Sequence, residues 1–373
     1  MSKPRPQWTG GTWLFSAPVD LGVFLGSAVV ALALLPVGAA LGVLHSDSPE
    51  WTWITAVLLV DVAHVWSTTF RVYADRDELA RRPWLYALVP VLAWIGGITL
   101  YSESRMLFWS VLAYLAVFHF VRQQYGWVAL YRARAGECDR VGRWLDSAAV
   151  YLATIFPLVY WHAHLPRAFV WFVPGDFVTR VSAVAALATR LLEPVYYLVL
   201  AAYLGRSAYR WLTLRIANPG KDIIVITTAA CWYLGIVAFD SDYAFTVTNV
   251  IIHGVPYFAL IYWYGKKRWQ AGQGGLVMRV FAGGPGLFLA IVWLLAYGEE
   301  LLWDRAVWHD RAWLFGAGWQ LESFHTLLVP LLAVPQATHY ILDGFLWRRR
   351  GNPGFASAVT TAQSGLVADR ASP

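Results

Sequence analysis

The sequence predicts an all-α, polytopic integral membrane protein with about ten transmembrane helices. Of its 373 residues, 58% are apolar and only 14% are charged. A water-soluble domain of this length could not bury so many apolar side chains, whereas ten spans of about 20 residues each would take up most of them. The chain also has 22 Trp residues, which are typical of the aromatic belts at the two membrane interfaces.

Apolar runs long enough to cross a bilayer occur in ten places and define the expected helices in order. They lie near residues 22–44, 51–70, 84–101, 106–128, 145–161, 193–212, 222–239, 244–264, 283–302 and 322–346. Together they form one membrane domain over 22–346, with an N-terminal segment at 1–21 and a tail at 347–373. The first run is too long for a signal peptide, so we expect it to remain as an anchor. The tail is expected to be disordered.

Basic residues alternate between the connections, and this alternation predicts the orientation of the chain. With residues 1–21 in the cytoplasm, most of the 29 Lys and Arg residues lie on the cytoplasmic side. The positive-inside rule therefore predicts that both termini are cytoplasmic. The formal net charge of +6 follows from this topology, so no nucleic-acid partner is expected. The expected location is a bacterial inner membrane, as a multi-pass protein.

Ionisable and amide side chains inside a bilayer are costly, so those within the apolar runs mark a candidate site. They occur on the second, fourth, eighth and tenth runs, which all cross the membrane in the same direction. The candidates are Asp61, His64, His119, Arg122, Gln123, Asn249, His253, His339 and Asp343. At about 1.5 Å per residue from the cytoplasmic boundary, the four histidines lie at similar depths.

Four imidazoles at one depth predict a transition-metal centre in the cytoplasmic half of the membrane. Imidazole binds zinc, iron, copper or nickel, and nearby carboxylates add charge compensation and suit iron or manganese. The expected ligands are His64, His119, His253 and His339, together with Asp61 and Asp343. Asp61 and His64 also have the three-residue spacing that di-iron helical bundles use. Glu322 and His325 repeat this spacing at the outer end of the tenth run, and their membership of the site stays open.

Polar side chains beside the expected ligands predict the catalytic groups. The expected catalytic residues are Arg122, Gln123 and Asn249, of which Arg122 and Gln123 would bind a substrate head group or tune the charge of the site. A metal inside a bilayer is useful chiefly for apolar substrates, because activated oxygen must be kept from water. We therefore expect an iron-dependent oxidoreductase, such as a hydroxylase, desaturase or oxygenase, that acts on a lipid or another apolar molecule and uses a separate electron donor.

The chain is similar in general character to the histidine-rich fatty-acid desaturases and hydroxylases of membranes. It has none of their HxxxH and HxxHH boxes, and its one HxH pair, His162 and His164, lies on the outer side. No catalytic residue is therefore assigned from this resemblance.

Three other functions stay open from the sequence. Asn249, His253 and Gly254 are loosely similar to the Asn and His chemistry of membrane-bound acyltransferases, in which an intramembrane His would act as a general base. Paired histidines on parallel helices could instead hold haem in an electron-transfer protein. A transporter could use the His, Asp and Arg side chains as a proton path.

Overall fold

The structure of this protein is a computed structural model that describes residues 13–273, 275–347 and 355. The described part is all-helical and contains no strand, as the sequence predicts. Most of the predicted segment 1–21 and of the predicted tail 347–373 lies outside the described residues.

Among the residues that the structure describes, eight helical segments are long and apolar enough to cross a membrane, which marks the chain as an integral membrane protein. The first segment, Ala17–Ala40, is made of α1 (Ala17–Asp20), η1 (Leu21–Gly26) and α2 (Ser27–Ala40). The second, Glu50–Val72, is made of α3 (Glu50–Thr52), η2 (Trp53–Val62) and α4 (Ala63–Val72). The third and fourth are the single helices α6 (Pro83–Glu103) and α7 (Arg105–Arg134).

The fifth segment, Thr179–Leu212, is made of η3 (Thr179–Val181) and α9 (Ser182–Leu212), and the sixth, Pro219–Ala238, is made of α10 (Pro219–Trp232) and η4 (Tyr233–Ala238). The seventh, Asp242–Gln270, is made of α11 (Asp242–Phe245), η5 (Thr246–Val250) and α12 (Ile251–Gln270). The eighth, Val277–Trp308, consists of η6 (Leu276–Gly283) from its second residue onwards, α13 (Gly284–Trp303) and η7 (Asp304–Trp308). The segments η1, η2, η4, η5 and η7 have the wider π-helical turn.

The predicted count of ten spans is not confirmed, because two of the predicted runs do not form a segment of this kind. The run near 145–161 forms α8 (Arg140–Ala163), in which polar residues at both ends lower the apolarity. The last run forms two shorter helices, α15 (His325–Leu332) and α16 (Val334–Leu346), which meet at Ala333. Pro330 and Pro335 flank this break. Proline interrupts a helix because it has no backbone N–H to donate to the preceding turn.

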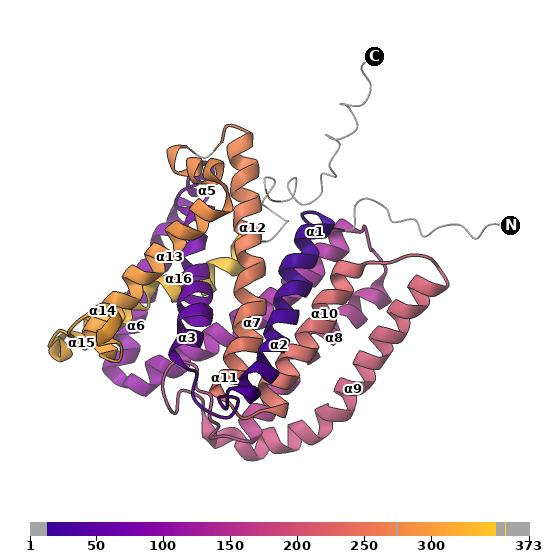
Figure 1. Cartoon of the computed structure of the whole chain (residues 1–373), viewed down its shortest axis with the longest axis horizontal. Helices are drawn as coiled ribbons and strands as arrows, with labels where there is room; N and C mark the ends of the chain where they lie inside the picture. The colour runs from indigo at the N-terminus through magenta and orange to yellow at the C-terminus, as the bar shows by residue number, and fades with distance from the viewer. Residues whose placement is uncertain (1–12, 274, 348–354, 356–373) are drawn as a thin grey trace.

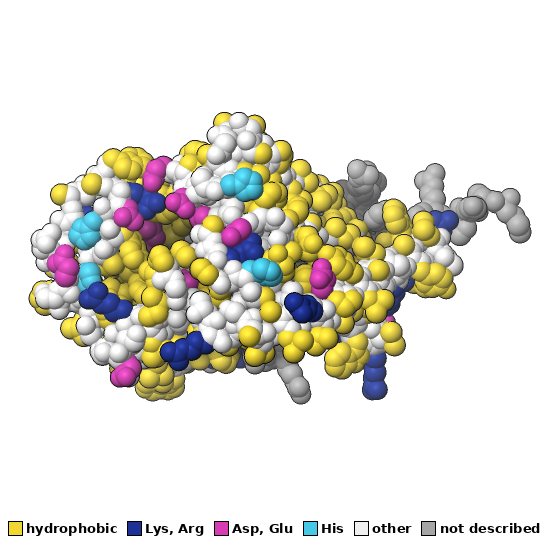
Figure 2. Space-filling model, turned by 90° about the horizontal axis from the view of Figure 1, so that it is seen from below, with side chains coloured by type: hydrophobic (Ala, Val, Ile, Leu, Met, Phe, Trp, Pro, Cys, Tyr) yellow, Lys and Arg dark blue, Asp and Glu magenta, His cyan; other side chains and the backbone are white. Residues whose placement is uncertain are grey.

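The connections that the positive-inside rule assigns to the cytoplasm lie at one end of the molecule. Figure 1 shows α5 (Arg76–Arg81), the start of α1 and the C-terminal end of α12 at this basic end. Arg268 of α12 reaches back to Asp75 with 2.8 Å between Nη2 and Oδ1, and the Arg134 Nε–H donates to the Trp13 carbonyl oxygen. Figure 2 views the opposite end, where acidic, basic and histidine side chains gather on part of the surface.

A buried ion network joins four helices at the basic end. The Lys221 ammonium group of α10 lies 2.7 Å from the carboxylate of Glu137 and 3.0 Å from that of Asp146 in α8. Arg132 of α7 pairs with the same two carboxylates, and Arg210 of α9 lies 3.3 Å from Glu137. Because each charge has a buried partner, the network fixes the relative positions of these helix ends.

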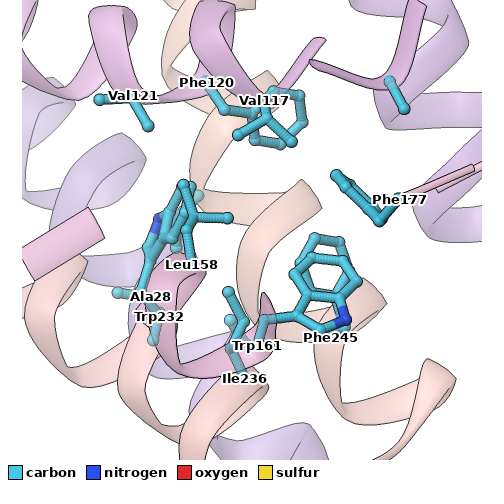
Figure 3. Close-up of a cluster of buried hydrophobic side chains, with 14 residues drawn as sticks. Ala28, Val117, Phe120, Val121, Leu158, Trp161, Phe177, Trp232, Ile236 and Phe245 are labelled. Carbon is cyan, nitrogen blue, oxygen red and sulfur yellow. The ribbon is translucent and has the colours of Figure 1, made fainter. Parts of the chain in front are cut away.

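A cluster of buried apolar side chains from α2, α7, α8, α10, η4, α11 and α12 lies beside the candidate site and is shown in Figure 3. Alanines at positions 28, 31 and 113 and Cys231 let the helices approach, and large rings fill the space between them. Phe120 belongs to this cluster and extends from it towards His253. The cluster therefore supports one side of the candidate site.

The ion network predicts a pH dependence of stability. Burial alone would raise the pKa of Glu137, but Lys221, Arg210 and Asn218 lower that pKa below its ordinary value of 4.5. The ionised carboxylate therefore stabilises the fold above pH 4.5, and this contribution is lost as the pH falls through the folded-state pKa. We expect Glu137→Gln to lower the free energy of unfolding by about 1–3 kcal/mol at neutral pH. If the melting temperatures of the wild type and Glu137→Gln fall by the same amount on acidification, the pH dependence does not come from the Glu137 carboxylate.

The predicted orientation can be tested with the native cysteines. Cys138 is exposed in the loop between α7 and α8, whereas Cys231 is buried. With both termini in the cytoplasm, a membrane-impermeant maleimide should label Cys138 only after spheroplasts are permeabilised, and Cys138→Ser should remove the signal. Labelling of Cys138 in intact spheroplasts would show that the chain has the opposite orientation.

Candidate metal centre

Four helices each contribute one buried histidine to a single point in the molecule. His64 lies in α4, His119 in α7, His253 in α12 and His339 in α16, and their exposed fractions are 0–3%. Two of these histidines lie shortly after π-helical segments: His64 is two residues after the end of η2 at Val62, and His253 is three residues after the end of η5 at Val250. Such wide turns are frequent at functional sites, because they rotate the residues that follow relative to a regular α-helix.

A glycine allows two of these helices to come close together. A Cβ atom on Gly254 would lie 2.5 Å from Cγ1 of Val60, so α12 can pack this closely against η2 only with glycine at this position. Small residues have this role at many helix contacts in membranes. The contact lies beside His253 and one turn before His64, and it brings the two imidazoles together.

The Nε2 atoms of the four histidines converge. The Nε2–Nε2 distances are 3.1 Å for His253–His64, 3.2 Å for His64–His339 and 3.1 Å for His339–His119. One ligand atom from each of the four residues lies within 4.8 Å of the others. The remaining surroundings are protein side chains, so these nitrogens have little access to water.

The four rings form a closed cycle. The neighbouring pairs are His64–His253, His253–His119, His119–His339 and His339–His64, with ring centroids 4.7, 5.0, 4.5 and 4.8 Å apart. His64 and His119 face each other across the cycle at 6.4 Å, with their ring planes 15° apart. Tetrahedral ligands would be equally spaced, so the arrangement is flattened towards a square.

This donor set fits a metal ion. Metal–nitrogen bonds of about 2.0–2.1 Å hold neighbouring ligand nitrogens roughly 2.9 Å apart in a square and roughly 3.3 Å apart in a tetrahedron. The three Nε2–Nε2 distances of 3.1–3.2 Å lie between these two values. Without an ion, each short Nε2 contact needs a proton between the two nitrogens, and charged imidazoles are costly in apolar surroundings. A metal satisfies all four lone pairs at once. The buried group of four histidines could therefore bind a metal ion.

Hydrogen-bonding side chains lie at the Nδ1 edges of the rings. Thr68 Oγ1 is 2.7 Å from Nδ1 of His339 and 2.8 Å from the hydroxyl of Tyr257, which donates to Asp343 over 2.7 Å. The Trp347 indole N–H donates to the same Asp343 oxygen. Partners of this kind hold the orientation of metal-binding imidazoles and raise their basicity.

The structure places both predicted carboxylate ligands behind the rings. Asp61 Oδ1 is 3.6 Å from Nδ1 of His64, and Asp343 Oδ2 is 3.7 Å from Nδ1 of His119. Neither carboxylate lies at the point where the Nε2 atoms meet. Their negative charges can instead compensate the charge of an ion held by the four imidazoles.

The other predicted residues have different places. Arg122 is exposed, and its guanidinium group bonds the Tyr151 hydroxyl of α8 and lies over the ring of Tyr125. The Gln123 side-chain amide donates to the His253 carbonyl oxygen over 2.7 Å and so supports α12. Asn249 is buried and donates to the Phe245 carbonyl oxygen within its own helix.

Glu322 and His325 lie away from the centre, at the start of the broken tenth run. His325 bonds the Ala306 carbonyl oxygen, with 2.9 Å between Nε2 and O.

Sequence reasoning assigned no role to Thr68, Tyr257 or Glu299. Thr68 follows His64 by one helical turn and Tyr257 follows His253 by one turn, so each shares a face with a candidate ligand. Glu299 is 4% exposed and accepts hydrogen bonds from the indoles of Trp66 and Trp303. Its position at the outer end of an apolar run gave no signal that distinguishes it from a loop carboxylate.

The chain matches no protein-family model, and it has no match among curated proteins or solved structures. The chemistry of the centre therefore has to follow from its own residues.

The centre predicts which histidines are needed for metal retention. His64→Ala, His119→Ala and His339→Ala should each remove bound transition metal from the purified protein, because each takes away one of four converging nitrogens. His164→Ala is the matched control, since His164 is exposed directly after the end of α8 and its Nδ1 bonds the Tyr160 carbonyl oxygen. Elemental analysis of protein purified without chelators measures the effect, and equal metal loss in His164→Ala would show that the assignment is wrong.

Thr68 provides a second, more selective prediction. Thr68→Val keeps the shape of the side chain but removes the bond to His339, and we expect metal affinity to fall about 10–100-fold. Thr69→Val is the control, because Thr69 is adjacent and only half-buried. Competition with a calibrated chelator gives both affinities, and an unchanged value for Thr68→Val would contradict the orienting role.

Proposed function

We propose that this protein is an iron-dependent membrane oxidoreductase, such as a hydroxylase, desaturase or oxygenase, that acts on a lipid or another apolar molecule. The convergence of four buried imidazoles inside a bundle of membrane-crossing helices carries this proposal. Iron held by His64, His119, His253 and His339 would supply the activation of dioxygen and the one-electron chemistry that protein side chains lack.

The donor set and its surroundings favour iron. Imidazole nitrogens bind several transition metals, and carboxylates close to the ligands suit iron better than copper. Asp61 and Asp343 provide two such negative charges at the Nδ1 edges of His64 and His119.

The residues around the centre exclude water. The ring of Phe120 stacks on that of His253 with 3.5 Å between centroids, and Trp171 of the outer connection contacts Phe120. The ring of Tyr340 covers that of His119, with 5.2 Å between the ring centroids. A dry environment of this kind protects reactive oxygen chemistry from side reactions with water, and it suits a substrate that arrives from the bilayer.

The geometry supports the alternatives less well. The imidazole rings contact one another, which leaves no room between them for the macrocycle of haem. An acyltransferase would need His253 and Asn249 to act together on a substrate, whereas Nε2 of His253 faces another histidine and Asn249 bonds its own helix. A proton path through Arg122 is disfavoured because Arg122 points away to α8.

The proposed setting is a bacterial inner membrane with both termini in the cytoplasm. The centre would then lie within reach of a cytoplasmic electron donor, and the basic end of the molecule offers a surface for an acidic one.

Oxygen consumption tests the proposal. Purified protein is loaded with ferrous iron under anaerobic conditions, mixed with membrane lipid extract and a chemical reductant, and exposed to oxygen. We expect catalytic oxygen uptake and oxidised lipid products by mass spectrometry for the wild type and His164→Ala, and neither for His64→Ala/His339→Ala. Equal uptake by the double variant would overturn the proposal. Tight binding of zinc with no iron-dependent uptake would leave a metal centre but refute the oxidoreductase.

A further inference from the structure

A groove of about 400 Å³ lies between α7 and α8 at the basic end of the molecule. Its volume falls within the range of about 300–1,000 Å³ that is typical of small-ligand sites. This space can hold a lipid head group together with the first part of an acyl chain. The groove takes no part in the candidate metal centre.

The groove changes from apolar to charged along the direction in which α7 crosses the membrane. Tyr125, Val128 and Ala129 line its deeper part, whereas Arg132 and Arg143 lie near its mouth. From residue 125 to residue 132, an α-helix rises about 10 Å. This polarity gradient matches a lipid that lies with its head group at the interface and its chain towards the membrane interior.

The mouth of the groove carries a positive charge that is not compensated. Arg132 is paired with Asp146, and the Glu137 carboxylate is paired with Lys221 and Arg210. Within the described ranges, Arg143 forms no ion pair and is exposed. One guanidinium group is therefore available at the mouth for a phosphate group, which is its natural bidentate partner.

An exposed tryptophan marks the depth of this mouth. Trp144 follows Arg143 directly, and 79% of its surface is exposed. Exposed tryptophans at helix ends lie at the level of the lipid head groups. Arg143 is therefore at the depth where a phosphate group of the membrane would be.

The groove and the metal centre use different faces of α7. Tyr125, Val128 and Arg132 repeat at three and four residues and so form one stripe, about 120° or more around the helix from His119. A ligand in the groove therefore does not reach the four imidazoles. The groove can be occupied whether or not the protein is an oxidoreductase.

We propose that this groove binds one anionic phospholipid. Its phosphate group pairs with Arg143, and one acyl chain lies along Tyr125, Val128 and Ala129. Basic pockets between membrane helices on the cytoplasmic side recognise anionic head groups in this way.

Native mass spectrometry of the full-length, detergent-purified protein tests the proposal. The protein is titrated separately with phosphatidylglycerol and with phosphatidylcholine, and the bound lipids per chain are counted. We expect one phosphatidylglycerol to be retained, with an affinity that falls about fivefold in Arg143→Gln, since one basic residue near a membrane surface contributes about this much. Arg140→Gln is the matched control, because Arg140 is exposed on the same helix but does not line the groove.

A second variant separates the groove from surface charge. Ala129→Phe fills the deeper part without changing any charge, and it should weaken phosphatidylglycerol binding while leaving the melting temperature close to that of the wild type. Equal loss in Arg140→Gln and Arg143→Gln would mean non-specific attraction and would overturn the proposal. Equal retention of phosphatidylcholine, or full phosphatidylglycerol binding to Ala129→Phe, would also overturn the proposal. Displacement of the lipid by excess inorganic phosphate would overturn it as well, because that result would indicate a phosphate site without an acyl-chain groove.

Discussion

The convergence of four imidazole nitrogens inside an apolar bundle is the constraint on which the rest of the structure depends. Three Nε2–Nε2 contacts of 3.1–3.2 Å link rings that are nearly inaccessible to water. Polar atoms in such surroundings need partners, and an ion bound at the centre satisfies all four together. The depth and rotation of α4, α7, α12 and α16 must therefore agree closely, because a shift of one helix by one residue would turn its imidazole away.

The rest of the fold holds these helices in place from both sides. At the basic end, Arg71 of α4 pairs with Glu78 of α5 over 2.8 Å, while Arg268 ties α12 to Asp75. Beside the centre, Gly254 allows the close approach of α12 to η2, and Phe120 connects His253 to the apolar cluster around α7. The ion pairs fix the helix ends, and the apolar contacts fix the distances between them.

The sequence allowed the class of fold and the four histidines to be predicted, for physical reasons. Apolar runs report membrane spans directly, and co-directional spans bring residues of equal depth to one level. It could not predict which way each side chain points. His119 and Arg122 are close in sequence, yet the first faces the centre and the second faces Tyr151 of α8, because the packing of neighbouring helices decides the rotation. The place of Asp61 and Asp343 behind the rings likewise depends on tertiary packing.

The coordination of the bound metal tests the central claim most directly. X-ray absorption spectroscopy at the edge of the metal that co-purifies with the protein, in the resting state and without chelators, reports the number and type of its ligands. Four imidazole nitrogens at about 2.0–2.2 Å, with the outer-shell scattering of histidine rings and a loss of this pattern in His64→Ala, would agree with the centre described here. A metal surrounded by oxygen or sulfur alone, or protein that retains no metal, would contradict it.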